Sequence, residues 1–174
     1  MVRLRFANPA SASRPRPPNH NNIKRKTMGC DIIIRTEVKR NGKWTSGDLY
    51  KKIGKEFQII EIYDGRSYSL FTILADVRNY NGVMTPISKP RGIPEDASEE
   101  YKNLCESWGV DGHSHSYLTL KEMEEFFDKR HEWTEVNHSF IILVDRLRNR
   151  LKEHYPYDYS DHTEDIRIVF FFDN

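Results

Sequence analysis

The strongest constraint on the fold is a continuous apolar run near the end of the sequence. Residues 166–172 read Ile-Arg-Ile-Val-Phe-Phe-Phe, and no polar residue follows Arg167 until Asp173. A run without polar alternation suits a strand that is buried on both faces, and such a strand lies near the middle of a covered sheet. We therefore expect a central C-terminal strand.

Further strands are predicted in the first third of the sequence. Residues 30–38 are rich in β-branched side chains and are followed by Asn41-Gly42, a strong signal for a two-residue hairpin turn, with a return strand beginning at Trp44. Residues 57–63 indicate another strand, closed by an Asp64-Gly65 turn.

Four segments repeat apolar residues at the three- and four-residue spacing of helices. The first covers about 68–78 and follows a Ser67 cap, and the last covers about 135–154. Between them, one helix begins at an Asp96–Glu99 capping box and ends at Gly109, and another begins at a Thr119–Glu122 capping box and ends at about Arg130. In the last helix the arginines lie mostly outside the apolar stripe. Residues 79–94, with three prolines, indicate a long ordered loop. The sequence thus predicts an α/β fold of the mixed α+β kind, in which three to four helices pack on a small mixed sheet with a central C-terminal strand.

Charge divides the chain into two parts. Of its 174 residues, the first 27 carry seven basic and no acidic residues, whereas the remainder carries 20 basic against 26 acidic ones. The tail is rich in proline and lacks periodicity, so we expect a disordered basic tail over 1–27 and a single α/β domain over 28–174. An acidic domain does not attract duplex nucleic acid non-specifically, so nucleic-acid binding is expected only through the tail.

The sequence also suggests a cellular compartment. No apolar run approaches the roughly 18 residues that span a bilayer, and the N-terminus lacks the apolar stretch of a secretory signal. We expect a cytoplasmic protein without membrane partners, in which Cys30 and Cys105 stay reduced.

The most unusual local motif is Gly112-His113-Ser114-His115-Ser116. Two histidines separated by one residue project to the same side of a regular strand, where they could bind one divalent metal or act as acid and base. A metal site needs a further ligand, for which Asp31, Asp76, Asp111 and Asp173 are candidates. Asp31 and Asp173 would meet at one edge of the sheet only if their strands run antiparallel. The alternative is a polar connection whose side chains satisfy backbone groups.

Cations near the predicted loop point to a phosphate-bearing ligand. Asp76 and Arg78 close the first predicted helix and are candidate catalytic residues beside the two histidines, while Lys89 and Arg91 are candidate substrate-binding residues. The alternative is a local pair between Asp76 and Arg78 and two solvated loop cations. Cys30 could act as a nucleophile, although a cysteine entering an apolar strand is usually a small buried hydrophobe.

Several segments together resemble a family of small bacteriophage and prophage proteins. They are Met28-Gly29-Cys30-Asp31-Ile32, Leu70 through Asn79, the loop from Pro86 to Pro94, Gly112 to Ser116, and Val169 through Asn174. Members of that family usually begin at the equivalent of Met28 and carry histidine where this chain has Ile33. The resemblance implies a viral or prophage origin and residence in the host cytoplasm, and it implies no particular reaction.

Two hypotheses for function follow. The first is a small hydrolase that acts on a phosphate-containing substrate through the histidines and aspartates, with or without a divalent metal. The second is a non-catalytic protein that binds a host protein or a small ligand.

Overall fold

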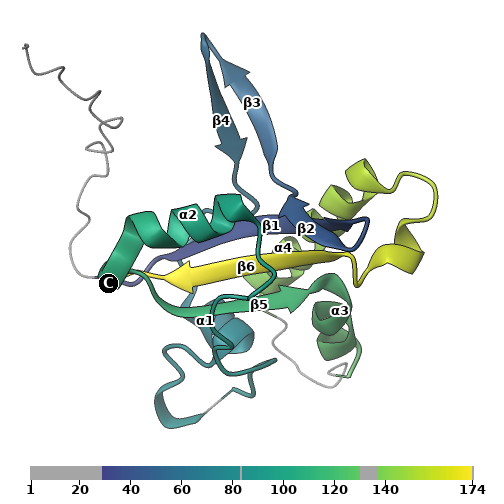
Figure 1. Cartoon of the computed structure of the whole chain (residues 1–174). Coiled ribbons are helices and arrows are strands. Elements are labelled where there is room, and N and C mark those ends of the chain that lie inside the picture. The colour runs from purple at the N-terminus through teal and green to yellow at the C-terminus, as the bar shows by residue number, and fades with distance from the viewer. Residues whose placement is uncertain (1–28, 83, 130–136, 174) are drawn as a thin grey trace, which may run out of the picture.

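The computed structural model describes residues 29–82, 84–129 and 137–173 (Figure 1). The basic tail expected over 1–27 lies outside the described residues.

A four-stranded sheet forms the centre of the molecule, in the order β2-β1-β6-β5. Its strands are β1 (Ile32–Arg40), β2 (Lys43–Ser46), β5 (His113–Thr119) and β6 (Ile166–Phe172). The expected α+β class and the central C-terminal strand are confirmed, and the three pairings of this sheet are all antiparallel. The Asn41-Gly42 turn joins β1 to β2 as expected, with positive φ at both residues.

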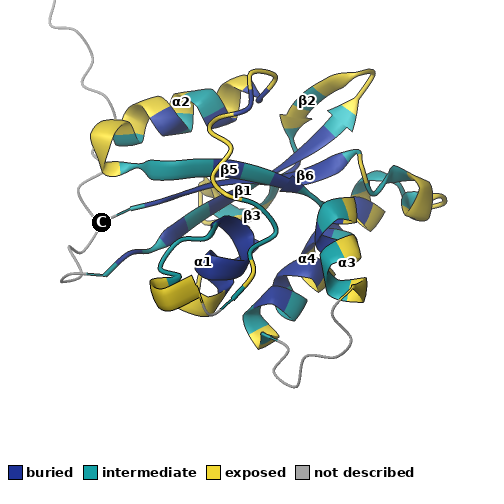
Figure 2. Cartoon of the chain, turned by 90° about the horizontal axis from the view of Figure 1, so that it is seen from below, coloured by how far each residue is buried: buried dark blue, intermediate teal, exposed yellow. Residues whose placement is uncertain are grey.

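Helices cover both faces of the sheet (Figure 2). Helices α1 (Tyr68–Ala75), α3 (Leu120–Asp128) and α4 (His138–His154) pack on one face, and α2 (Glu99–Trp108) packs on the other. Every residue of β6 is buried, with Phe170 and Phe172 facing the first group of helices and Val169 and Phe171 facing α2. This double burial explains the unbroken apolar run.

The helix boundaries follow local capping chemistry. The predicted capping box of α3 forms between Thr119 and Glu122. In α2 the cap is Ser98, whose hydroxyl accepts from the Tyr101 amide, and the expected Asp96 cap is wrong because its carboxylate accepts from Arg167 instead. Helix α4 begins at His138 after an Asn137 cap, and its expected start at about 135 lies outside the described residues. Short 3₁₀ turns lie at Tyr80–Gly82, Gly109–Asp111 and Tyr159–His162.

A second, two-stranded sheet stands apart from the first. Strands β3 (Leu49–Ile53) and β4 (Glu56–Ile60) pair antiparallel and project away from the main sheet as an arm (Figure 1). The strand expected over 57–63 is therefore shorter and lies outside the main sheet. Its partner β3 was not expected, because Lys51-Lys52 interrupts the apolar alternation.

Candidate functional site

The antiparallel pairing of β1 and β6 brings two of the predicted site residues together at one end of the sheet. The Asp31 amide donates to the Asp173 carboxylate at 2.6 Å, and the Asp173 amide donates to the Asp31 carbonyl at 3.1 Å. The Nε of Arg66 donates to the Asp31 carboxylate at 2.6 Å. Both carboxylates thus already accept charge-assisted or backbone hydrogen bonds.

Arg78 and Cys30 lie at the same end of the sheet. Arg78 donates to the Tyr80 hydroxyl at 2.8 Å. Burial raises the pKa of the Cys30 thiol, and this effect is larger than the lowering caused by a hydrogen bond between Arg78 and Cys30. A fully buried cysteine with a raised pKa stays a thiol at neutral pH, so the structure gives Cys30 the surroundings of a core residue. Asp76 ends α1 in the left-handed region and accepts from the Asn79 side chain at 2.6 Å.

The two histidines of the His-Ser-His motif point to opposite faces of the sheet, so the expectation of a shared side is wrong. The His113 ring stacks on Phe172, whereas the His115 ring packs on Phe171, 5.1 Å between centroids, beside Cys105. The cause is local: the register of β5 shifts between His113 and Ser116, and Ser114 has a φ of 52°. Desolvation lowers the pKa of His115, which favours its neutral form.

The expected metal set of Asp31, His113, His115 and Asp173 is therefore not assembled around one point. In the ranges that the structure covers, no three histidine, cysteine or acidic side chains are grouped to hold a metal ion.

The loop cations do not join Arg78 either. Arg91 lies along β5, where it forms an ion pair with Glu122 at 2.6 Å and stacks over the Tyr117 ring. Lys89 is exposed in the same loop. The predicted cluster of cations is thus divided between the end of the sheet and the edge formed by β5.

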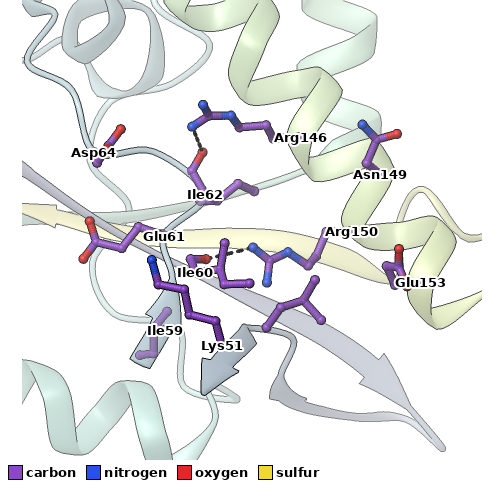
Figure 3. A pocket seen from close by; sticks show the side chains of 11 residues that line it. Lys51, Ile59, Ile60, Glu61, Ile62, Asp64, Arg146, Asn149, Arg150 and Glu153 are labelled. Atoms are coloured by element: carbon purple, nitrogen blue, oxygen red, sulfur yellow. Dashed lines mark hydrogen bonds between the residues drawn. The ribbon is translucent and has the colours of Figure 1, made fainter. Parts of the chain in front are cut away.

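A groove of about 610 Å³ lies between the arm and α4, and none of the site residues expected from the sequence lines it (Figure 3). Its walls come from both strands of the arm, the linker after β4 and one side of α4. The lining side chains are Leu49, Lys51, Ile59, Ile60, Glu61, Ile62, Asp64, Arg146, Asn149, Arg150 and Glu153. A hollow of this size is in the range that holds a small molecule.

Two arginines from successive turns of α4 tie the linker to the helix. Arg146 donates to the Ile62 carbonyl at 3.0 Å, and Arg150 donates through Nη2 to the Ile60 carbonyl at 2.9 Å (Figure 3). Only 6 % of Arg150 is exposed, and its other terminal nitrogen, Nη1, is buried with no hydrogen-bond partner among the described residues.

Burial disfavours the charged form of the Arg150 side chain. Desolvation lowers the pKa of its guanidinium, although Asp48 and Glu153 act in the opposite direction. A guanidinium nevertheless stays protonated in proteins, so the wall of the groove contains a desolvated positive charge whose buried Nη1 has no acceptor among the described residues. Such a donor is best satisfied by an oxyanion.

Arg150 is not among the predicted site residues, because the helical pattern groups it with the arginines outside the apolar stripe. The available signal was the four-residue spacing of Arg146 and Arg150, which places both on the same side of one helix. That spacing alone does not reveal that the linker lies against this side.

No family model, curated protein or solved structure matches this chain. The resemblance to bacteriophage proteins therefore stays a prediction. Within the described ranges, the helices are too short or too polar to cross a bilayer.

Proposed function

We propose that this chain binds a small phosphate-bearing ligand in the groove between the arm and α4, and releases it unchanged. The observation that carries the proposal is the buried guanidinium of Arg150, whose Nη1 lacks a partner beside an open hollow. A phosphate oxygen at Nη1 satisfies this donor, and a charged acceptor forms a stronger bond than a neutral one.

Arg146 supports the same ligand class. It lies one helical turn from Arg150, so the two guanidinium groups can contact different oxygens of one phosphate. Lys51 and Asn149 line the same groove and supply further donors.

Acidic residues in the groove limit what the rest of the ligand can be. Glu61, Asp64 and Glu153 line it together with the three cations. A second anionic group would be repelled, whereas an ammonium group would be attracted. We therefore infer a ligand in which a phosphate is attached to a neutral or cationic remainder.

The binding hypothesis is preferred to the hydrolase hypothesis because of where the candidate acid and base groups lie. His113 and His115 occupy opposite faces of the sheet, and Asp31 and Asp173 accept hydrogen bonds at its end. None of these four residues lines the groove.

Calorimetric titration of the full chain tests the proposal. The probes are inorganic phosphate, glycerol phosphate and phosphoethanolamine, and we expect saturable binding with phosphoethanolamine as the tightest ligand. Arg150→Met should weaken binding by about 10- to 150-fold, since a charged hydrogen bond contributes about 1.5–3 kcal/mol. Arg146→Gln, at a less buried position, tests the same contact with less effect on packing.

The matched control is Arg148→Met on the same helix. Arg148 pairs with Glu124 and Asp145, away from the groove, so this variant should bind all three probes as the native chain does. Equal binding by the native chain and Arg150→Met, or no binding of any probe, would contradict the proposal. Conversion of a bound phosphate ester to inorganic phosphate would support the hydrolase hypothesis instead.

A further inference from the structure

The two faces of the arm differ in chemistry. In the register of β3 and β4, Tyr50 lies opposite Ile59 and Lys52 lies opposite Phe57, so these four residues share one face, here called the aromatic face. Tyr50 and Phe57 are 53 % and 69 % exposed. The other face contains Leu49, Lys51 and Ile60, which line the groove, and Ile59 of the aromatic face also lies at its edge.

Large exposed aromatic side chains on a projecting hairpin need an explanation. An isolated two-stranded hairpin is marginally stable in water, and exposed apolar patches usually mark contact surfaces. Phe57 is the second residue of β4, next to the turn that joins β3 to β4. The arm that these strands form projects away from the main sheet (Figure 1). The exposure of Phe57 is therefore more consistent with contact to another molecule than with folding.

We propose that the aromatic face of the arm binds single-stranded nucleic acid. Bases of any sequence stack on exposed aromatic rings, and lysines beside the rings attract the phosphate backbone. Tyr50 and Phe57 are diagonal neighbours across the two strands, a relation that separates residues by about 7–8 Å. This spacing lets each ring accept a separate base.

The charges of the arm favour a polyanion. The aromatic face has Lys52 and no carboxylate, and the arm adds Lys51 and Lys55 against a single acid, Glu56, which the register places on the other face. The arm is thus positive although the domain as a whole is acidic. A protein partner is disfavoured because lysine is depleted at the centres of protein interfaces, whereas Lys52 is directly opposite Phe57.

Fluorescence anisotropy with a labelled oligothymidine and the full chain tests this inference. Phe57→Ala and Tyr50→Ala should each weaken binding by about 5- to 150-fold, the measured range for losing one stacked base. Both variants keep every charge, so any contribution of the N-terminal lysines and arginines is the same in all proteins compared. Phe57→Trp should retain binding, and its fluorescence should be quenched as the oligonucleotide is added.

The control is Tyr157→Ala, which removes another tyrosine that is 98 % exposed but lies outside the arm. It should bind the oligonucleotide as the native chain does. Circular dichroism establishes that each variant is folded. The proposal would be overturned if Phe57→Ala and Tyr50→Ala both kept native affinity, or if Tyr157→Ala lost as much affinity as they do. It would also be overturned if the native chain bound no oligonucleotide and instead formed a concentration-dependent dimer that Phe57→Ala abolishes. Because Phe57 does not line the groove, this result is independent of phosphate-ligand binding there.

Discussion

At the residue scale, His162 lies between two carboxylates, an arrangement that no sequence pattern predicts. Its Nδ1 lies 2.7 Å from Asp165 and its Nε2 lies 3.3 Å from Asp158, while its ring stacks on Tyr155 at 3.9 Å. The hydrogen bond to Asp165 is the main reason why the pKa of His162 is raised, with Asp158 contributing in the same direction. The folded protein therefore binds a proton here more tightly than the unfolded chain does.

This raised pKa predicts a pH-dependent contribution to stability. A histidine whose folded pKa exceeds its unfolded value of about 6.5 stabilises fully below that value, and the contribution is lost as pH rises through the folded pKa. His162→Gln should therefore cost more stability at pH 5.5 than at pH 8.5. Urea unfolding of both proteins across this range measures the difference.

Comparison with the native chain removes the effect of the other histidines. Burial lowers the pKa values of His115 and His154, so they favour stability at higher pH, but they are present in both proteins. A cost of the substitution that does not change with pH would contradict the raised pKa of His162.

Single residues also show why the site was only partly predictable. The strand patterns predict that Asp31 and Asp173 lie close together if their strands are antiparallel, and β1 and β6 do pair in this way. The separation of His113 and His115 does not follow from strand patterns, because it depends on a left-handed serine that sequence patterns do not favour at that position. Arg150 was missed because its burial is caused by a linker far away in the chain.

At the element scale, a buried ion pair holds α2 on the sheet. Glu37 of β1 accepts from the Ser98 amide at the start of α2 and from Arg167 of β6, both at 2.7 Å. The Arg167 guanidinium also lies over the Trp44 ring at 4.0 Å. Glu37 is only 1 % exposed, and its loss leaves the buried Arg167 guanidinium with Asp96, an exposed residue, as its remaining carboxylate partner.

Glu37→Ala should therefore lower the free energy of unfolding by about 3–5 kcal/mol. Chemical denaturation measures this loss, and Glu99→Ala, at an exposed position on α2, should change stability by no more than about 0.5 kcal/mol. Similar values for the two variants would mean that the pair does not determine how α2 is attached.

Elements with strong local patterns were predicted well, and those that depend on partners were not. Strand β6 and the capping box of α3 agree with their patterns because burial and capping act over a few residues. Strand β3 was missed because its lysines are solvent-exposed, so it has no buried side that would produce a regular alternation. Asp96 was mistaken for a cap because Arg167, distant in sequence, binds its carboxylate.

At the scale of the whole molecule, stability should be unevenly distributed. Strands β1 and β6 share seven register pairs inside the core, whereas β3 and β4 pair only with each other. Local opening requires little free energy where few apolar contacts are broken. Amides of residues 49–60 should thus exchange with deuterium much sooner than those of 166–172.

Mass spectrometry of exchanged peptides measures this difference directly. Addition of phosphoethanolamine should slow exchange around residues 60–62, where the linker contacts the arginines of α4. Protection of the free arm equal to that of β6 would show that the arm is covered in solution.

The pairing of Ile32 with Phe172 also affects how the chain is made. Strand β1 can pair with β2 soon after both are synthesised, but its other partner, β6, is synthesised after all the other described elements. Until then the nascent chain exposes an unpaired apolar edge, the kind of surface that aggregates or recruits chaperones. Pairing across such a long sequence separation is also slow, so the sheet closes late, after translation has passed Phe172.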